Sequence, residues 1–301
     1  MEISQSELSS PKVILARHGK SFYWASLFLG DKLANNAARL YQFCRFVDDL
    51  ADGDLPDRQE SLEDIRASLA GNTGVAGPEV ADFLQLAAEN NIPLVAASEL
   101  LDGMLSDQTT TAFNDEAELL RYCHAAAGTV GLMMCKVLKS KEHRAESFAI
   151  DLGIAMQLTN IARDVLEDAQ MGRRYLPATW VDLTAAEIAN LSINTQEPVA
   201  IALKKLLELA DEYYQSALLG IHLLPFRTRF SITVALRIYR QIGVLLKRRN
   251  FCWWHGRVYV AIPEKILLSF RSLIDFRPRV VPAHKHKLHQ HLQGLAGVIA
   301  P

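Results

Sequence analysis

Hydrophobic residues recur at steps of three and four positions along almost the whole chain. In residues 35–52, NNAARLYQFCRFVDDLAD, the apolar positions that follow this spacing are Ala38, Leu40, Tyr41, Phe43, Cys44 and Val47. Residues three or four apart lie on the same face of a helix. The same spacing runs through residues 115–138, 145–170, 202–224 and 226–249, and alternation at period two is not sustained. The pattern predicts an all-α protein with roughly ten helices.

Clusters of Gly, Pro and Asn separate the predicted helices, but none is long enough to serve as a linker between domains. We therefore expect a single helical domain over residues 1–301, with a core at about residues 12–275. The last residues, 276–301, mix His and Lys with weak periodicity and are expected to form a loosely ordered terminus. A metal-binding tract is the alternative, but no carboxylate or Cys within this tail helps to define a site.

The composition narrows the class of protein. The chain has 301 residues, of which 50% are hydrophobic and 22% charged, and its net charge of −2 predicts no attraction to nucleic acid. The four Cys residues lack CxxC spacing and are expected to be buried thiols in a reducing compartment. The N-terminus lacks the basic start and apolar run of a signal peptide, and no segment reaches the ~18 uninterrupted apolar residues of a spanning helix. These features predict a cytoplasmic protein.

Two pairs of Asp residues stand four positions apart within apolar helical segments. Asp48 and Asp52 form one pair, and Asp164 and Asp168 form the other, on a different helix. Carboxylates at this spacing repel each other on an isolated helix. A divalent cation between them makes the arrangement favourable, because Mg²⁺ combines carboxylates with water and phosphate oxygens. Two such faces turned toward each other would hold Mg²⁺ against a diphosphate leaving group, whereas two unrelated solvated faces are the alternative.

Arginines accompany both acidic pairs. Arg45 precedes Asp48 by three residues, Arg163 directly precedes Asp164, and Arg173 follows in the segment GRRY. The guanidinium group can form paired hydrogen bonds with phosphate oxygens. Acids for a metal and Arg for phosphate, repeated in two places, favour a metal–diphosphate site over two solvated surfaces.

Several segments resemble the squalene and phytoene synthase family, in that family's order and spacing over residues 15 to 270. They are HGKSFYWAS, YQFCRFVDDLAD, YCHAAAGTVGLMM, DLGIAMQLTNIARDVLEDAQMGRRYLP and IYRQIG. The resemblance implies the all-α isoprenoid synthase fold around a central cavity. It also implies a prenyltransferase that condenses two prenyl diphosphates head to head. The first step makes a cyclopropylcarbinyl diphosphate, and the second ionises and rearranges it, with release of diphosphate.

The resemblance also assigns roles to individual residues. It implies a metal site, for Mg²⁺ with Mn²⁺ as a substitute, formed by Asp48, Asp49, Asp52, Asn160, Asp164 and Asp168. It implies substrate contacts from His18, Ser21, Phe22, Tyr41, Arg45, Asn160, Arg163 and Arg173. Tyr122 matches a family tyrosine near the reacting carbons, where its ring could steady a carbocation or its hydroxyl help move a proton. The aspartates of the two pairs and Tyr122 are thus the catalytic candidates, although Tyr122 as a core aromatic and His124 as a satisfied helix histidine are alternatives.

A carbocation must be shielded from water, so the cavity walls should be apolar. The candidate wall residues, most of which we expect to be ordinary core, are Phe22, Leu27, Ala38, Val47, Val130, Leu132, Met133, Met134, Met156 and Leu158. Gly128 and Gly131 are expected to let helices or a prenyl chain approach closely.

The resemblance is strongest to bacterial phytoene synthases, which implies two geranylgeranyl diphosphates as substrates and phytoene, a carotenoid precursor, as product. Ser26 and Ala38 are small, which would leave length for a C20 chain. Squalene or dehydrosqualene synthesis from C15 farnesyl diphosphate is the alternative. NADPH is not expected to be required, and no GxGxxG motif follows a strand, although family members that use NADPH also lack this motif.

A non-catalytic prenyl-lipid-binding or assembly protein of the same fold is the alternative of another class. The presence of all five aspartates argues against it. A hydrocarbon product would need delivery to a bilayer, so peripheral contact with the inner membrane face is a further hypothesis. Its candidate surface places Phe251, Trp253 and Trp254 beside the basic cluster of Lys247, Arg248, Arg249 and Arg257. That cluster could instead be a solvated helix end, and the oligomeric state stays open.

Overall fold

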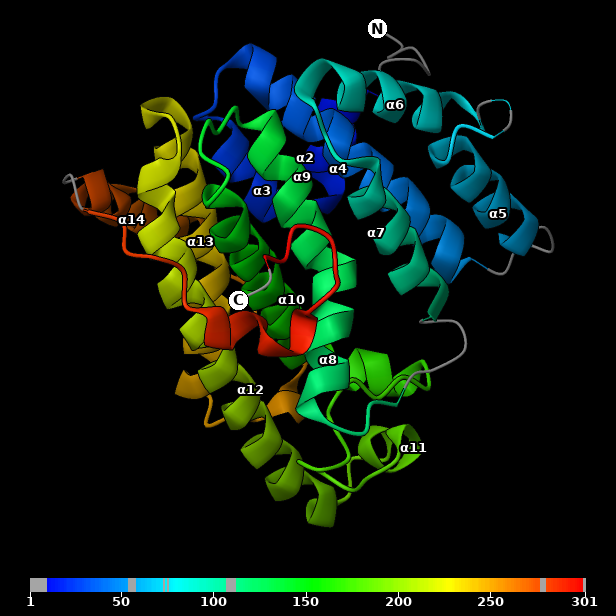
Figure 1. The fold of residues 1–301 in the computed structure, drawn as a ribbon. Coiled ribbons are helices and arrows are strands. Elements are labelled where there is room, and N and C mark those ends of the chain that lie inside the picture. The colour runs from blue at the N-terminus through cyan, green and yellow to red at the C-terminus, as the bar shows by residue number, and fades with distance from the viewer. Residues whose placement is uncertain are drawn as a thin grey trace, which may run out of the picture.

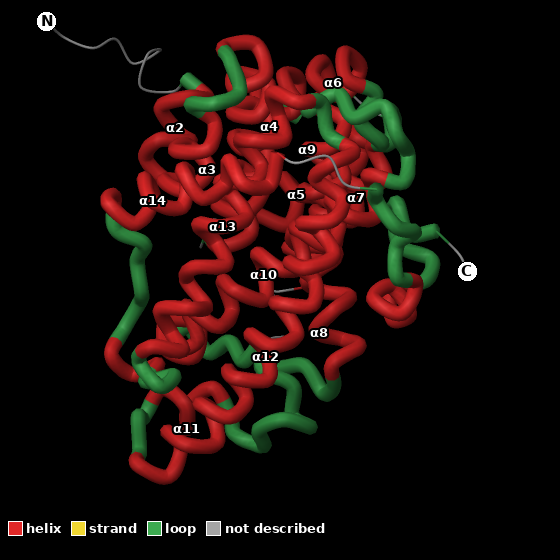
Figure 2. Tube along the Cα trace, turned by 90° about the vertical axis from the view of Figure 1, so that its left-hand side faces the viewer, coloured by secondary structure: helices red, strands yellow, loops and turns green. Residues whose placement is uncertain are grey.

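The computed structural model describes residues 10–53, 58–72, 74, 76–106, 112–276 and 280–299. The helices are α2 (Pro11–His18), α3 (Lys20–Ser26), α4 (Asp31–Asp52), α5 (Arg58–Leu69), α6 (Pro78–Asn90), α7 (Leu94–Ser106), α8 (Glu116–Cys123), η1 (His124–Gly128), α9 (Thr129–Val137), α10 (Ala145–Gln170), α11 (Ala185–Ala189), α12 (Ile193–Gly220), η2 (Ile221–Leu223), α13 (Phe226–Arg248), η3 (Trp253–His255), α14 (Ile262–Ser272), η4 (Leu273–Phe276) and η5 (His286–Leu292). Helices and loops without strands make up this part of the chain (Figure 2), which confirms the all-α prediction.

Helix α10 lies at the centre of the molecule, between α9, α12 and α13 (Figure 1). Most of its 26 residues are apolar or small, and its buried positions lie on several faces rather than on one stripe. A helix that is apolar nearly all round is stable only when other helices cover it. The surrounding helices therefore fix the position of α10 and of every polar side chain that it carries.

Glycines allow α10 to approach η1 and α9 without intervening side chains. A Cβ atom on Gly153 of α10 would collide with the backbone of Ala127, with its carbonyl carbon only 2.6 Å away. A Cβ atom on Gly131 of α9 would lie 2.8 Å from the carbonyl carbon of Ala149. As expected from the sequence, Gly131 serves a close helix–helix approach. The π-helical turn η1 directly follows α8 and leads into α9.

Helix α4 buries one face and leaves the other available for polar groups. Leu40, Phe43 and Val47 are buried, and the ring of Phe43 stacks on Phe83 of α6 with centroids 3.8 Å apart. The helix begins after Gly30, whose φ of 78° suits glycine. The acidic motif of the sequence lies on the last turns of this helix.

The C-terminal segment packs against the helices, which differs from the expected loose terminus. Its residues 280–299 cross the face formed by α8, α9 and α10 (red in Figure 1). Leu292 has no exposed surface, and the Tyr213 hydroxyl donates a hydrogen bond to the carbonyl of Leu288 at 2.7 Å. The expectation of a loosely ordered terminus was wrong because His284 and His289 form hydrogen bonds with a buried carboxylate, Asp151, on α10.

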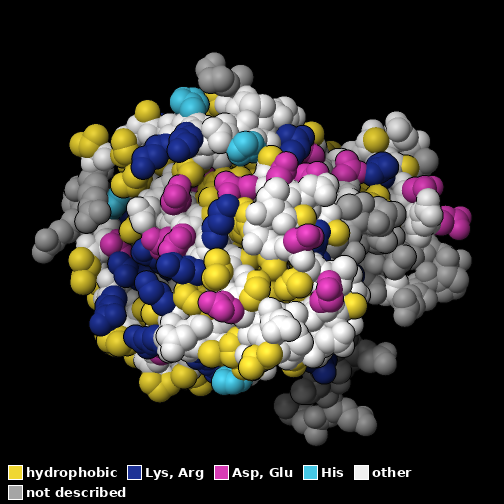
Figure 3. All heavy atoms as spheres, turned by 90° about the horizontal axis from the view of Figure 1, so that it is seen from below, with side chains coloured by type: hydrophobic (Ala, Val, Ile, Leu, Met, Phe, Trp, Pro, Cys, Tyr) yellow, Lys and Arg dark blue, Asp and Glu magenta, His cyan; other side chains and the backbone are white. Residues whose placement is uncertain are grey.

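The exposed hydrophobic side chains also differ from the expected aromatic patch. Trp253 is 2% exposed and Trp254 only partly exposed, so the two tryptophans do not form a free surface. Among the described residues, a group of six exposed apolar residues lies instead on α14 and η4, namely Ile262, Ile266, Leu267, Phe270, Leu273 and Ile274. Seen from below, Lys and Arg side chains gather toward the same side of the molecule (Figure 3). No helix of the described residues is long and apolar enough to cross a bilayer.

Candidate active site

A single cavity of about 830 Å³ runs between the helices and contains side chains from both acidic motifs. Asp48 of α4 lines it, and so do Asp164 and Asp168 of α10. The two motifs are more than a hundred residues apart in sequence. The packing of α4 and α10 around the cavity therefore brings together the two faces that the sequence predicted.

The first acidic motif is held by Arg45, which lies one turn earlier on α4. Its Nη1 donates to Asp48 at 3.1 Å and its Nε to Asp49 at 2.9 Å. Burial lowers the pKa of Arg45, but the two carboxylates outweigh burial and raise the pKa overall. Asp49 is exposed and is not among the lining residues, and the side chain of Asp52 lies outside the described residues. Metal ligation by Asp49 and Asp52 stays a prediction.

The second acidic motif lies on three successive turns of α10. Asn160, Asp164 and Asp168 all line the cavity. Arg163 donates two hydrogen bonds to the Asp164 carboxylate, from Nε at 2.7 Å and from Nη2 at 2.6 Å. Arg257 approaches the same carboxylate with Nη2 at 2.9 Å from Oδ2. Two guanidinium groups therefore stabilise the charge of one carboxylate.

Arg257 is a site residue whose place the sequence did not reveal. In the sequence it stands near the basic cluster at the end of α13, yet it lines the cavity and pairs with Asp164, 93 positions earlier. None of the five family-like segments of the sequence contains Arg257. Because it is part exposed, it can reach an entering phosphate as well as Asp164.

The donor set at the second motif fits a divalent cation. The Oδ1 atom of Asn160 is buried and has no hydrogen-bond partner among the described residues. A buried amide oxygen without a partner is costly, and a metal ion or its bound water would satisfy it. With the carboxylates of Asp164 and Asp168 on the next two turns, the oxygen atoms are those that Mg²⁺ prefers.

Aromatic rings form part of the cavity wall. The Tyr122 ring on α8 stacks on Tyr175 with centroids 5.1 Å apart, and both residues line the cavity. The ring centroid of Phe22 on α3 lies 5.0 Å from that of Tyr239 on α13 and 6.2 Å from that of Tyr41 on α4. Their negative ring faces are suited to stabilising a cation.

Tyr175 and Tyr239 were not among the predicted site residues, although both stand in quoted motifs. Burial raises the pKa of Tyr239 to about 12, so its hydroxyl keeps its proton at neutral pH. It lies in the electrostatic environment of Arg163 and Asp164. A neutral hydroxyl there can donate a hydrogen bond to a charged oxygen.

The other predicted contacts divide between the cavity and the core. His18, Ser21 and Arg173 line the cavity, and their contacts with substrate stay predictions. His124 does not line it and has no exposed surface, and its Nε2 donates to the carbonyl of Ala296 at 3.1 Å. His124 is therefore a buried helix histidine outside the cavity, but it is only half satisfied, because its Nδ1 has no hydrogen-bond partner among the described residues.

Only some of the candidate wall residues reach the cavity. Those that line it are Phe22, Val130, Met134 and Met156. Leu27 is 59% exposed, and the remaining candidates, Ala38, Val47, Leu132, Met133 and Leu158, are core residues away from the lining. Of the two small residues expected to leave room for a long chain, Ser26 lines the cavity and Ala38 does not, whereas its neighbour Ala37 does.

Comparison with known proteins points to one family. Residues 15–264 match the squalene/phytoene synthase family. The chain is 34% identical to a 15-cis-phytoene synthase of Enterobacter agglomerans over 83% of this chain and 89% of that protein. It is 34% identical to a 15-cis-phytoene synthase of Paracoccus sp. over 88% of this chain and 90% of that protein.

Among solved structures, a dehydrosqualene synthase in complex with a ligand is similar, with a TM-score of 0.79 and 25% identity. The similarity covers 90% of this chain and 96% of that one. Squalene synthase HpnC of Alicyclobacillus acidocaldarius, with a TM-score of 0.69 and 21% identity over 82% of this chain and 97% of that one, shows the same fold.

Proposed function

The chain belongs to the squalene/phytoene synthase family and is a prenyltransferase that joins two prenyl diphosphates head to head, and we propose that it converts two geranylgeranyl diphosphates into phytoene. The observation that carries the proposal is the single cavity in which Asp48, Asp164 and Asp168 share a lining with Arg45, Arg163 and Arg257. Carboxylates for a metal and guanidinium groups for phosphate converge there beside apolar walls.

We propose that the carboxylates of both motifs and the Asn160 amide hold Mg²⁺, with Mn²⁺ as a substitute. When bound, the ion would stabilise the negative charge that develops on the departing diphosphate. The arginines would orient the same diphosphate, because each can exchange its hydrogen bonds with Asp48 or Asp164 for bonds to phosphate oxygens. Pyrophosphate release with Mg²⁺, with Mn²⁺ and after chelation tests this assignment, and full activity after chelation would refute it.

The aromatic wall would protect the reacting carbons. Tyr122 and Tyr175 stack beside the cavity and present ring surface rather than water to a carbocation. The Tyr122 hydroxyl is proposed to help move the proton that leaves as the hydrocarbon forms. A proton loss that ends the reaction requires no reductant, so NADPH is not expected to be needed.

Small side chains along the lining support the longer substrate. They include Ala25, Ser26, Ala37, Ala127, Ala149 and Ala217. Residues of this size leave length between the helices for a C20 chain. The phytoene synthases to which the chain is 34% identical point to the same substrate.

The deciding experiment gives the purified protein C15 or C20 diphosphate, with and without NADPH, and identifies the hydrocarbon by mass spectrometry. We expect phytoene from the C20 substrate without NADPH, and no product from Asp164→Asn. Squalene or dehydrosqualene as the main product would assign the chain to the C15 alternative. Prenyl diphosphate binding without pyrophosphate release would favour the non-catalytic lipid-binding alternative.

We also propose that α14 contacts a membrane surface, where an insoluble hydrocarbon could leave. Ile262, Ile266 and Phe270 follow one another at steps of four and are 63%, 43% and 67% exposed. Tyr259, just before this helix, lines the cavity. Exposed basic residues at the end of α13, including Lys247 and Arg248, add attraction to anionic lipid.

Flotation with vesicles that contain anionic lipid tests the membrane contact. Phe270→Glu should reduce the bound fraction, because it places a charge in the apolar stripe. Ile201→Glu on α12 is the matched control, since Ile201 is 61% exposed outside this surface. An equal loss of vesicle binding in both variants, or no vesicle binding by the parent protein, would refute the proposed membrane contact.

A further inference from the structure

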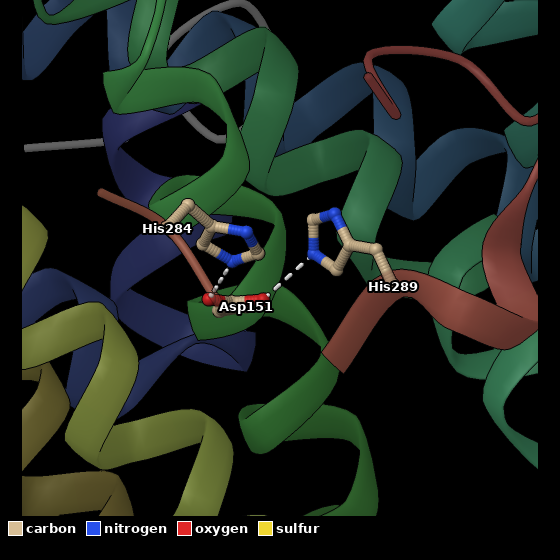
Figure 4. A group of neighbouring side chains, drawn as sticks. All are labelled: Asp151, His284 and His289. Atoms are coloured by element: carbon tan, nitrogen blue, oxygen red, sulfur yellow. Dashed lines mark hydrogen bonds and ion pairs between the residues drawn. The ribbon is translucent and has the colours of Figure 1, made fainter. Parts of the chain in front are cut away.

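Three side chains that the cavity does not use converge at the start of α10. The Oδ2 atom of Asp151 lies 2.8 Å from Nε2 of His284, and its Oδ1 atom lies 2.8 Å from Nε2 of His289. Figure 4 shows the two imidazole rings reaching the carboxylate from the C-terminal segment, from opposite sides. Ser216 of α12 adds a hydrogen bond to Oδ2 at 2.5 Å.

The buried carboxylate lacks a permanent positive partner. Asp151 has no exposed surface, and its ion pairs among the described residues are with the two histidines alone. A neutral imidazole donates a hydrogen bond but supplies no positive charge. Because an uncompensated buried charge is costly, the cluster requires either a protonated histidine or a bound cation.

The ligand atoms are of the kind and number that hold a transition metal. The carboxylate oxygen and the two imidazole nitrogens all lie within 4.8 Å of one another. Zinc at ~2.0–2.1 Å from each donor would set donor–donor distances of about 3.3 Å, so each imidazole nitrogen, now 2.8 Å from its own carboxylate oxygen, would move away from that oxygen by about 0.5 Å. Three protein ligands leave a fourth position for water.

The surroundings supply the space for that movement and for the water. A separate cavity of about 250 Å³ borders the cluster, and its lining includes His284, His286 and His289. Arg144, also on this lining, binds Glu142 at 2.8 Å and the carbonyl of Val281. Its charge therefore already has partners of its own.

We propose that Asp151, His284 and His289 form a binding site for a divalent transition metal, with zinc the best match to the ligand set, which fastens the C-terminal segment to α10. The two histidines lie 133 and 138 positions after the carboxylate. A metal that joins such distant residues stabilises the folded chain, because it binds the unfolded chain far more weakly. The site does not depend on the proposed prenyl chemistry.

The site also borders the prenyl cavity. The ring of Phe148 meets His284 edge to face, with centroids 5.2 Å apart, and Phe148 lines the large cavity. The metal would hold His284 in place behind this wall residue. Its role is positional, since none of the three ligands is among the residues that line the large cavity.

The test measures zinc binding by the full-length, tag-free protein after chelation and dialysis, in excess Mg²⁺ to occupy the acidic motifs. We expect one equivalent of zinc and a rise in Tm of about 5 °C at a zinc concentration about 100 times Kd. His284→Gln and His289→Gln should each weaken binding by about 100-fold or more. His291→Ala is the matched control, because His291 lies on the same segment outside the cluster.

Circular dichroism of each variant shows whether it is folded, and Asp151→Asn provides a third ligand test. Absence of zinc binding by the parent protein, or equal binding by the parent and both folded Gln variants, would overturn the proposal and leave a hydrogen-bonded cluster only. Zinc binding needs no prenyl substrate, so failure here would be distinct from failure of the prenyltransferase assay.

Discussion

The close approach of α10 to η1 gives a prediction whose size follows from the structure. Gly153→Ala places a methyl group 2.6 Å from the carbonyl carbon of Ala127 and 2.9 Å from the amide nitrogen of Gly128. Both are backbone atoms, so no side chain can turn away. Ordinary contact begins at 3.4 Å, and the carbonyl oxygen of Ala127 lies closer to the methyl group than its carbon does, so the two elements must separate by about 1 Å or more.

This separation should affect both stability and catalysis. Overpacking of this kind costs about 3 kcal/mol, which corresponds to a fall in Tm of roughly 6–10 °C for a chain of this size. Helix α10 carries Asn160, Asp164 and Asp168, while η1 directly follows α8, the helix that carries Tyr122. Because catalytic groups misplaced by about 1 Å can lose ~100-fold in rate, turnover should fall by ten- to a hundredfold in the variant that remains folded.

Chemical denaturation and pyrophosphate release measure the two effects. Gly243→Ala on α13 is the matched control, since its Cβ meets only the flexible Leu207 side chain, at 3.1 Å. The control should change stability by less than about 1 kcal/mol, with alanine's helix preference offsetting the contact. If Gly153→Ala is as stable and active as Gly243→Ala, α10 and η1 are not packed closely enough to exclude a methyl group.

Four further substitutions test the site and the buried histidine. Asp48→Asn should lower turnover at least about 1,000-fold while leaving the Tm nearly unchanged, and retained turnover would contradict its assignment. Tyr122→Phe should lower kcat more than it raises KM, and a pure KM defect would exclude the proposed role. Arg257→Ala should raise KM about tenfold or more, whereas Arg249→Ala, at the exposed end of α13, should not. Burial lowers the pKa of His124 from 6.5 to about 4, so its contribution to stability is present above pH 6.5 and is lost as the pH falls toward 4. The free energy of unfolding should therefore decrease more steeply over that range in the parent than in His124→Gln, by at most ~1.4 kcal/mol per pH unit, and parallel curves would contradict the assignment.

The all-α fold and the two acidic motifs could be predicted because their signals are local. Apolar spacing of three and four identifies a helix wherever it occurs, and Asp164 and Asp168 share a helix face for the same geometric reason. The motifs also carried the family resemblance, which the match over residues 15–264 confirmed. Placement of Tyr122 and His18 at the cavity followed from that resemblance rather than from periodicity.

The features that were predicted wrongly from the sequence depend on contacts between distant segments. Ala38 and Ser26 are both small, but only packing decides that Ser26 faces the cavity and Ala38 the core. Trp253 looks like a surface aromatic in its local sequence, yet it is buried against the body of the protein. Periodicity shows which face of a helix is apolar, but not whether that face meets another helix, an open cavity or solvent.

The order of the C-terminal segment is the clearest case of a property decided by the tertiary structure. The sequence by itself determined that the tail offers imidazole side chains and that α10 carries an acidic residue among apolar ones. Only folding brings Asp151 within 2.8 Å of His284 and His289, and it buries Asp151 and His289 while leaving His284 partly exposed. Charge compensation depends on distance and burial, and neither is encoded in the spacing of residues along one segment.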